Sequence, residues 1–529
     1  MKVVRKGSFA TKRTVRRLLC AYPPRLFFCA GLIVGQMAVM AALLCRAAYL
    51  SAAAFSVCWG TSLALALWVA AREESGSYKT AWILTILGLP PAGALLWLTW
   101  GVRGPSPGRK RALRRAKEQQ TAFFLPDAGE LEALSQQNPT LGVQAAYLWR
   151  VSGFGPMDRT QVDYCPLGED QFRVMIKELP LARKFILLEY FILEPGEMWD
   201  SILLILRRKA REGVEVRVIW DDLGCIRTLP PGTRRRMEEW GISTLVYNPL
   251  SPGIDPSLNY RDHRKICVVD GRVGICGGVN LADEYINKKR LHGHWKDTAV
   301  VLRGPGVWGL TRMFFQLWCS GGGGPIGEPE RYRVPWPLDG PFSPPDCPGY
   351  VQPYCDSPLD RHRVAENAYL NLVGRAKRYV WITTPYLILD SSFLSALCTA
   401  AQSGVQVRVL CPRQGDRWFV HMVTRSYYPP LLQAGAEIWE YSPGFIHAKM
   451  AVCDGEAAVV GTANLDFRSL YLHHECAVAL WECPAVGEIA EDIRRTLEKS
   501  QRVTLEELLD EPWPKRVLAA FLRLFAPLM

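Results

Sequence analysis

At 529 residues, the chain is long enough for two or three domains or for one large duplicated domain. Its formal charge of +12 would suit a protein that binds nucleic acid, but the excess of positive charge lies in two short segments. Residues 1–25 hold eight lysines and arginines and residues 103–117 hold seven, and neither segment contains an acidic residue. The remaining chain has a slight acidic excess, which disfavours nucleic acid as a partner. Both segments flank apolar stretches, so we expect either binding to anionic lipid headgroups or ordinary topology charges without lipid specificity.

Three uncharged stretches follow the first basic segment, at residues 26–45, 47–71 and 80–102. Each is long enough to cross a bilayer as a helix, although Pro90 and Pro91 are expected to kink the third. We therefore expect two or three transmembrane helices and a multi-pass protein of the cell membrane. Three crossings would place the two basic segments on opposite sides, against the positive-inside tendency, so the number of crossings and their sidedness stay open.

The sixteen cysteines include many within apolar runs and no close C-x-x-C pair. This usage is typical of buried free thiols in a reducing compartment rather than of disulfides or metal ligands. We therefore expect the catalytic region on the cytoplasmic face of the membrane.

Beyond residue 140 the chain reads as two similar halves. Four segments of the first half have counterparts in the same order in the second: 182–193 with 376–389, 210–219 with 401–410, 240–249 with 434–443, and 297–302 with 475–480. Matching landmarks in matching order indicate internal duplication. Strands that alternate with helices ended by glycine predict an α/β fold, with two duplicated α/β sandwich halves around a pseudo-two-fold axis behind N-terminal transmembrane helices.

The expected organisation has six segments. They are a basic N-terminal segment (1–25), a membrane region (26–102), a basic connector (103–140), a first half (141–325), a second half (326–510) and a C-terminal segment (511–529). The last is predicted to form an amphipathic helix, which lies either on the bilayer surface or against the protein body.

A motif H-x-K-x4-D-x6-G-[GT]-x-N occurs once in each half. Its chemistry-bearing residues are His263, Lys265, Asp270 and Asn280 in the first copy and His447, Lys449, Asp454 and Asn464 in the second. Histidine and lysine two apart share one face of a strand, and the small residues before each asparagine leave room for a ligand. Two histidines, two lysines and two asparagines suit phosphoryl transfer: cations and amides stabilise the phosphate while one imidazole attacks phosphorus and the other moves a proton. No metal site or cofactor is expected.

The two copies of this motif resemble the HKD motifs of the phospholipase D superfamily. The resemblance of the chain to that superfamily covers roughly residues 140–510. The flanking residues 188–192, 295–297, 384–386 and 425–428, together with the apolar N-terminal stretches, are most similar to bacterial cardiolipin synthases. The resemblance implies a membrane phosphatidyltransferase that joins two phosphatidylglycerol molecules into cardiolipin and glycerol through a phosphatidyl-histidine intermediate.

The resemblance also implies individual roles. His263 would be the nucleophile and His447 the general acid and base, although the near symmetry of the motifs leaves this order open. Lys265, Lys449, Asn280 and Asn464 would bind the substrate phosphate. Asp270 and Asp454 belong to the family's catalytic motif, but we interpret them as framework carboxylates that hold the turn after each strand.

Asp297 and Glu475 occupy equivalent positions after the two motifs. We expect each to accept a hydrogen bond from the histidine of its own half, with a surface salt bridge as the alternative. The nearby His292, His294, His473 and His474 lack a third ligand at a suggestive spacing, so loops beside a polar cleft explain them better than a metal site. The pair His473-His474 departs from the usual family pattern.

Other functions stay open. A membrane-bound phospholipase D or another phosphodiesterase would use the same residues, and a nuclease is disfavoured by the location of the positive charge. A catalytically dead scaffold is disfavoured because both motifs are intact. Membrane phospholipids are the expected partners, and the oligomeric state is unknown.

Overall fold

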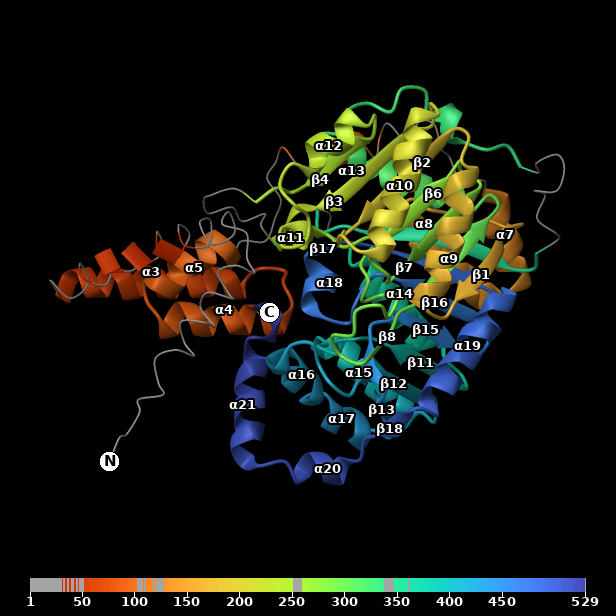
Figure 1. Ribbon diagram of the computed structural model, residues 1–529. Coiled ribbons are helices and arrows are strands. Elements are labelled where there is room, and N and C mark those ends of the chain that lie inside the picture. The colour runs from red at the N-terminus through yellow and green to blue at the C-terminus, as the bar shows by residue number, and fades with distance from the viewer. Residues whose placement is uncertain are drawn as a thin grey trace, which may run out of the picture.

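The computed structural model describes residues 52–101, 128–250, 259–336, 347–359 and 362–528, with scattered positions in 31–46 and 108–118. Its body consists of two stacked α/β halves (Figure 1). The first half is built on a sheet of seven strands in the order β1-β9-β7-β6-β2-β3-β4. These strands are β1 (Gln161–Cys165), β2 (Phe185–Tyr190), β3 (Glu215–Asp221), β4 (Ser243–Tyr247), β6 (Ile266–Val269), β7 (Val273–Gly277) and β9 (Ala299–Arg303).

The second half repeats this order as β10-β17-β16-β15-β11-β12-β13, with β18 added at the edge. Its strands are β10 (Tyr350–Asp356), β11 (Tyr379–Thr383), β12 (Gln406–Pro412), β13 (Glu437–Tyr441), β15 (Met450–Cys453), β16 (Ala457–Gly461), β17 (His473–Trp481) and β18 (Ser500–Arg502). In both sheets the central strand β2 or β11 pairs in parallel with the next strand and antiparallel with the motif strand. The identical topology confirms the duplicated α/β fold.

Helices cover the sheets, as buried parallel strands require. α7 (Ala128–Gln137) and α8 (Pro139–Ser152) precede β1 in the chain but pack on the second half, where Leu141 and Leu148 share a buried cluster with Tyr369 and Leu372. In the first half the helices are α9 (Gly168–Glu178), α10 (Glu197–Arg211), α11 (Asp222–Cys225), α12 (Thr233–Glu239) and α13 (Val307–Ser320). In the second they are α14 (Val364–Arg375), α15 (Ser391–Gln402), α16 (Trp418–Arg425), α17 (Tyr428–Gln433), α18 (Phe467–Tyr471), α19 (Pro484–Leu497), α20 (Leu505–Leu509) and α21 (Trp513–Leu524). Short 3-10 turns are η2 (Leu179–Leu181), η4 (Pro329–Tyr332) and η5 (Ala526–Leu528).

One hydrophobic core joins the two halves. Ile266 and Val300 from the first sheet lie in the same buried cluster as Met450 and Val478 from the second. The thirteen cysteines of the described part of the chain are all free thiols, most of them buried. The expected burial is confirmed for nine of them, and Cys58, Cys319, Cys347 and Cys398 are partly buried.

Two short strand pairs cross the seam between the halves. β5 (Arg261–Asp262) pairs in parallel with β17 of the second half, and β14 (Gly444–Ile446) pairs in parallel with β8 (His294–Lys296) of the first. β5 and β14 lead directly into the motif histidines, β8 leads into Asp297, and β17 itself carries Glu475. The seam therefore positions the candidate site.

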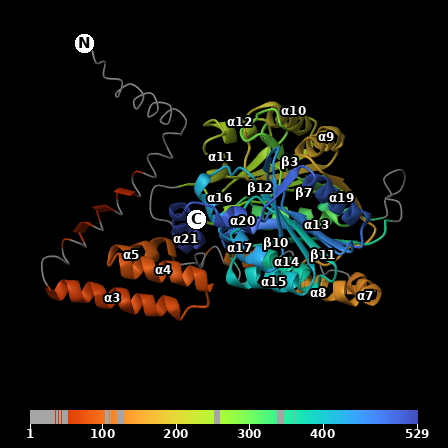
Figure 2. The same cartoon turned by 90° about the horizontal axis from the view of Figure 1, so that it is seen from below.

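The N-terminal helices form a separate group beside the body, next to α21 and the C-terminus (Figures 1 and 2). They are α3 (Ala52–Ala70), α4 (Gly76–Gly88), α5 (Ala92–Leu96) and the π-helix η1 (Trp97–Gly101). Of the helices described, none is both long and apolar enough to cross a membrane. The first expected span, residues 26–45, lies largely outside the described residues.

The third expected span, residues 80–102, is divided at the two prolines that were expected to kink it. The chain breaks at Pro90 and Pro91 into α4 and α5. The prolines have no N–H group for the helical hydrogen bonds, so α4 cannot continue through them. The two pieces fold back on one another, where Trp82 and Ile86 of α4 share a buried cluster with Trp97.

Candidate active site

The two motif histidines lie at the seam, and each is anchored to the opposite half. His263 follows β5 and His447 follows β14. The backbone N–H of His263 donates to the carbonyl of His474 at 2.9 Å, and that of His447 donates to the carbonyl of Lys296 at 2.7 Å. The histidines are only 7% and 8% exposed. The duplication therefore brings both imidazoles into one buried region.

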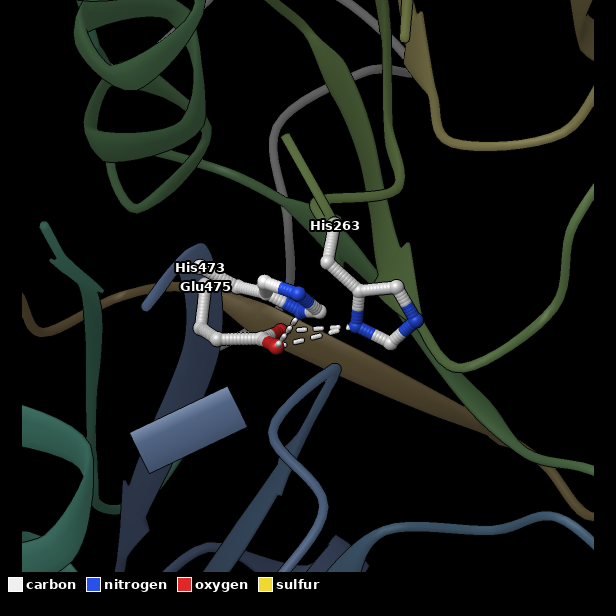
Figure 3. Close-up of side chains that lie close together, drawn as sticks. All are labelled: His263, His473 and Glu475. Atoms are coloured by element: carbon white, nitrogen blue, oxygen red, sulfur yellow. Dashed lines mark hydrogen bonds and ion pairs between the residues drawn. The ribbon is translucent and has the colours of Figure 1, made fainter. Parts of the chain in front are cut away.

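Each imidazole is paired with a carboxylate from the other half. Nδ1 of His263 is 2.9 Å from Oε1 of Glu475, and Nδ1 of His447 is 2.5 Å from Oδ2 of Asp297. Figure 3 shows Glu475 reaching across to His263. The expectation that each acid serves the histidine of its own half is therefore wrong. The reason is that β8 and β17 cross the seam and carry their acids beside the opposite motif.

Both histidines are neutral at pH 7. Burial lowers the pKa of His263 to about 3, against the opposing charge of Glu475. Burial also lowers the pKa of His447 to about 4, with Lys449 acting in the same direction and Asp297 opposing it. At His263 the carboxylate of Glu475 assigns the single proton to Nδ1, which leaves Nε2 as the basic and nucleophilic atom. At His447, Nδ1 contacts both Asp297 and Nζ of Lys449, which lies 2.6 Å away.

Two buried ammonium groups accompany the histidines. Nζ of Lys265 donates to the carbonyl of His263 at 2.6 Å, and Nζ of Lys449 donates to the carbonyl of His447. Burial lowers the pKa of Lys265 to about 8 and that of Lys449 to about 7, and the charge of Lys265 adds to the shift at Lys449. The two motifs thus act on one another electrostatically. Two cations in one buried site attract an anionic phosphate.

The two motif asparagines, Asn280 and Asn464, differ in the hydrogen bonds that their side chains make. Oδ1 of Asn280 accepts from the N–H of Ile192 at 3.0 Å, and its Nδ2 donates to the hydroxyl of Tyr285 at 2.7 Å. Because an amide nitrogen carries two hydrogens, one donor is left for a ligand. Asn464 is 7% exposed, and its Oδ1 has no hydrogen-bond partner in the described part of the chain.

Asp270 and Asp454 lie away from the histidines, at the opposite ends of β6 and β15. Each occupies a turn with positive φ, at 52° and 54°. Each carboxylate accepts from three consecutive backbone N–H groups at the start of the central strand of its own half: Arg183, Lys184 and Phe185 for the first, and Lys377, Arg378 and Tyr379 for the second. This geometry is that of framework carboxylates, so their place among the catalytic residues is not supported.

Arg264 is a charged residue that the sequence reasoning missed. Its Nε lies 2.6 Å from Oε1 of Glu189 and 3.2 Å from Oδ1 of Asp262, and all three residues are buried. The sequence did indicate an unusual residue here, because Arg264 is a charged side chain between His263 and Lys265 and points to the opposite face of an extended chain. The second half has no such network, because Ala448 replaces the arginine.

His473 is a third imidazole at the centre. Its ring lies 5.6 Å from that of His263, and its Nδ1 is 3.8 Å from Glu475 (Figure 3). The equivalent position in the first half is Trp295, whose ring lies 5.3 Å from that of His447. The aromatic ring that packs beside the motif histidine is therefore a tryptophan, Trp295, in one half and a titratable histidine, His473, in the other. The sequence signal was the unusual pair of histidines before Glu475.

His263, His473 and Glu475 place three donor atoms within 4.8 Å of one another. Such a set has the composition of a His2Glu metal site. Lys265 and Arg468 contribute positive charge beside this set, and Glu475 and Asp466 contribute negative charge. Charges of both signs therefore surround these three residues.

Family models match most of this architecture. The model described as "Cardiolipin synthase, PLD-like domain" matches residues 175–295 and 369–498, one segment in each half. The model described as "Phospholipase_D-nuclease N-terminal" matches residues 62–101, which hold the second half of α3 and all of α4, α5 and η1.

Relatives extend over nearly the whole chain. An uncharacterised protein of Streptococcus mutans is 41% identical over 85% of this chain and 96% of its own length. A cardiolipin synthase of Geobacillus kaustophilus is 31% identical over 90% of this chain and 94% of its own length. Among solved structures, the phosphatidylserine synthase of Haemophilus influenzae covers 74% of this chain and 100% of its own, with a TM-score of 0.57 and 13% identity. This last likeness concerns the fold.

Proposed function

Since the chain belongs to the cardiolipin synthase family of phospholipase D-like phosphatidyltransferases, we propose that it joins two phosphatidylglycerol molecules into cardiolipin and releases glycerol. The observation that carries the proposal is the pair of crossed histidine–carboxylate contacts, with two buried ammonium groups beside them. A double displacement at phosphorus needs one nucleophile, one proton carrier and fixed positive charge, and the seam supplies all three.

In the first step, Nε2 of His263 attacks the phosphorus of one phosphatidylglycerol. The bond from phosphorus to the glycerol oxygen breaks, and His447 gives that oxygen a proton. Glycerol leaves, and the phosphatidyl group is held on His263. Lys265 and Lys449 stabilise the charge on the phosphate oxygens while five groups surround phosphorus.

In the second step, the terminal hydroxyl of a second phosphatidylglycerol loses its proton to His447 and attacks the same phosphorus. The bond to His263 breaks, and cardiolipin leaves. His447 then carries the proton for the next cycle, so acid and base roles alternate on one residue. Asp297 stabilises the charged form of His447, and Glu475 holds the ring of His263 in position.

The neutral state of His447 in the free protein fits a substrate-triggered acid. Its low pKa results from burial and from Lys449. An anionic phosphate that binds between the lysines offsets their charge and raises the pKa of His447. Substrate binding therefore favours the charged form of His447 that the first step needs.

The decisive assay follows labelled phosphatidylglycerol with the purified full-length protein in detergent micelles. Cardiolipin and glycerol in equal amounts are the expected products. Phosphatidic acid would show that water is the acceptor and that the protein is a lipid phosphodiesterase. No turnover by a folded protein would contradict both activities.

The dependence of kcat/KM on pH should reflect the protonation of Lys265 and Lys449. We expect kcat/KM to fall on the alkaline side between about pH 7 and 8, because Lys449 and Lys265 have pKa values of about 7 and 8 and bind phosphate only when protonated. Bound phosphate raises both pKa values, so the alkaline fall in kcat should lie at higher pH. Lys449→Arg keeps its charge and should move the fall in kcat/KM upward. An unchanged profile in this variant would contradict the assignment.

We also propose that α3 and α21 attach the protein to the membrane. On α3, Phe55 and Leu67 are exposed, and on α21, Trp513, Val517 and Phe521 are exposed. The other face of α21 packs on the body, where its Arg523 donates to the carbonyl of Ser426. The helix thus contacts the body and still presents an apolar surface.

Phe521→Glu should weaken binding to phosphatidylglycerol vesicles about tenfold or more, because burial of a phenylalanine side chain contributes about 1.5–3 kcal/mol. Co-sedimentation measures the effect, and Phe521→Leu is the matched control that keeps an apolar side chain. Equal binding by both variants would show that α21 does not contact lipid.

A further inference from the structure

A cavity of about 430 Å³ separates the N-terminal helices from the catalytic body. One wall is formed by α4, α5 and η1 and includes Trp82, Leu96 and Trp100. The opposite wall includes Asn259, Arg468 and Leu472, which belong to the second half or to the segment before the first motif. The cavity therefore lies between an aromatic and aliphatic surface and a surface that carries a cation. Its volume is in the range of small-molecule sites, about 300–1,000 Å³.

The polar side of the cavity is suited to an anion. Nη2 of Arg468 donates to Oδ1 of Asn259 at 3.2 Å. Burial lowers the pKa of Arg468, and the neighbouring charges of Arg417 and Arg261 act in the same direction, while Asp466 opposes them. Arg261 and Arg417 have carboxylate partners of their own, Asp221 at 3.2 Å and Asp416 at 3.9 Å, whereas Arg468 lines the cavity. A phosphate diester would accept the remaining N–H donors of Arg468.

The same arginine connects the cavity to the catalytic centre. Arg468 lies on α18, and Leu472 is the residue between α18 and the start of β17 at His473. The charge of Arg468 contributes to the lowered pKa of His473. The ring of His473 in turn lies 5.6 Å from that of His263. The helix that carries Arg468 therefore leads directly to the imidazole that packs beside the proposed nucleophile.

We propose that this cavity binds one phospholipid substrate, with an acyl chain against Trp82, Leu96 and Trp100 and the phosphate directed toward Arg468. The inference rests on the proposed phosphatidyl transfer and names the place where a lipid is held for it. An amphiphile with an anionic headgroup matches both walls, whereas a soluble phosphate ester would leave the aromatic wall without an apolar partner. The N-terminal helices thus form part of the substrate site in addition to any role as an anchor.

Binding can be measured apart from turnover in the full-length His263→Ala protein, which cannot form the covalent intermediate. Labelled phosphatidylglycerol is titrated in micelles of a neutral detergent. In this protein we expect Leu96→Trp to weaken binding about tenfold because the larger side chain fills the cavity. We expect the same loss from Arg468→Gln because it removes the positive charge on the cavity wall. The matched control is Leu98→Trp, because Leu98 lies two residues further on, is 54% exposed and does not line the cavity. Its binding should be unchanged.

In otherwise wild-type protein, Arg468→Gln should raise KM for phosphatidylglycerol about tenfold with kcat within about twofold, and Arg468→Lys should restore most of the loss. Phosphatidylcholine should compete more weakly than phosphatidylglycerol. Equal binding by the Leu96→Trp and Leu98→Trp proteins would overturn the proposal, as would equal competition by the two lipids. If the binding pattern holds but no cardiolipin forms, the cavity stands and the proposed reaction fails.

Discussion

Replacing His263 by alanine should reduce cardiolipin synthesis by at least about 10⁴-fold, and replacing His447 should reduce it by about 10²–10⁴-fold. The first change removes the attacking nitrogen, and the second removes only the proton carrier. Turnover is measured with labelled phosphatidylglycerol, and circular dichroism confirms that each variant folds. Substantial activity in either protein would contradict the two-histidine mechanism.

A modified donor separates the two roles. Phosphatidyl p-nitrophenol has a leaving group that needs no proton, so His447→Ala should still release about one equivalent of p-nitrophenol in a burst. His263→Ala should give no burst, because no phosphatidyl-histidine can form. A burst in the His263 variant and none in the His447 variant would reverse the assignment, which the symmetry of the two motifs allows.

Asp297→Asn and Glu475→Gln should each reduce turnover about 10²-fold, because a neutral partner no longer stabilises the charged imidazole or fixes its tautomer. The crossed pairing predicts different defects in the two variants. Glu475 contacts His263, so Glu475→Gln should slow the burst from phosphatidyl p-nitrophenol. Asp297 contacts His447, so Asp297→Asn should leave that burst nearly unchanged while slowing transfer from phosphatidylglycerol.

The reverse pattern would support pairing of each acid with the histidine of its own half. Asp454→Asn serves as a control for lost charge outside the site, because its carboxylate is bound by backbone N–H groups of Lys377, Arg378 and Tyr379. Asp454→Asn should lower the unfolding temperature. It should not change the rate of the p-nitrophenol burst relative to the rate of transfer from phosphatidylglycerol.

Much of the fold could be predicted because its signals are local. Strands such as β2 and β11 are continuous apolar runs, and each motif strand ends in an aspartate followed by glycine. The positive φ of Asp270 and Asp454 and the backbone N–H groups around them match the framework role expected from the turn. Repetition of these signals at matching positions also identified the duplication.

Other features depend on contacts between distant segments. His263 and Glu475 are 212 residues apart, and His447 and Asp297 are 150 apart. Spacing within one motif gives no information about which half supplies the acid. The position of His473 beside His263 and the cavity above Arg468 likewise arise where separate elements meet.

The sequence by itself determined the chemical groups, their twofold repetition and the α/β character of each half, because these depend on residue type and short-range periodicity. The tertiary structure decided how the groups are combined. β5 pairs with β17 and β14 pairs with β8 across the seam, so each histidine receives its carboxylate from the opposite half. The prolines after α4 turn the chain back, so the N-terminal helices can form one wall of a cavity beside the site. Side-chain partners so far apart in the chain are chosen by strand pairing and packing, which no local pattern encodes.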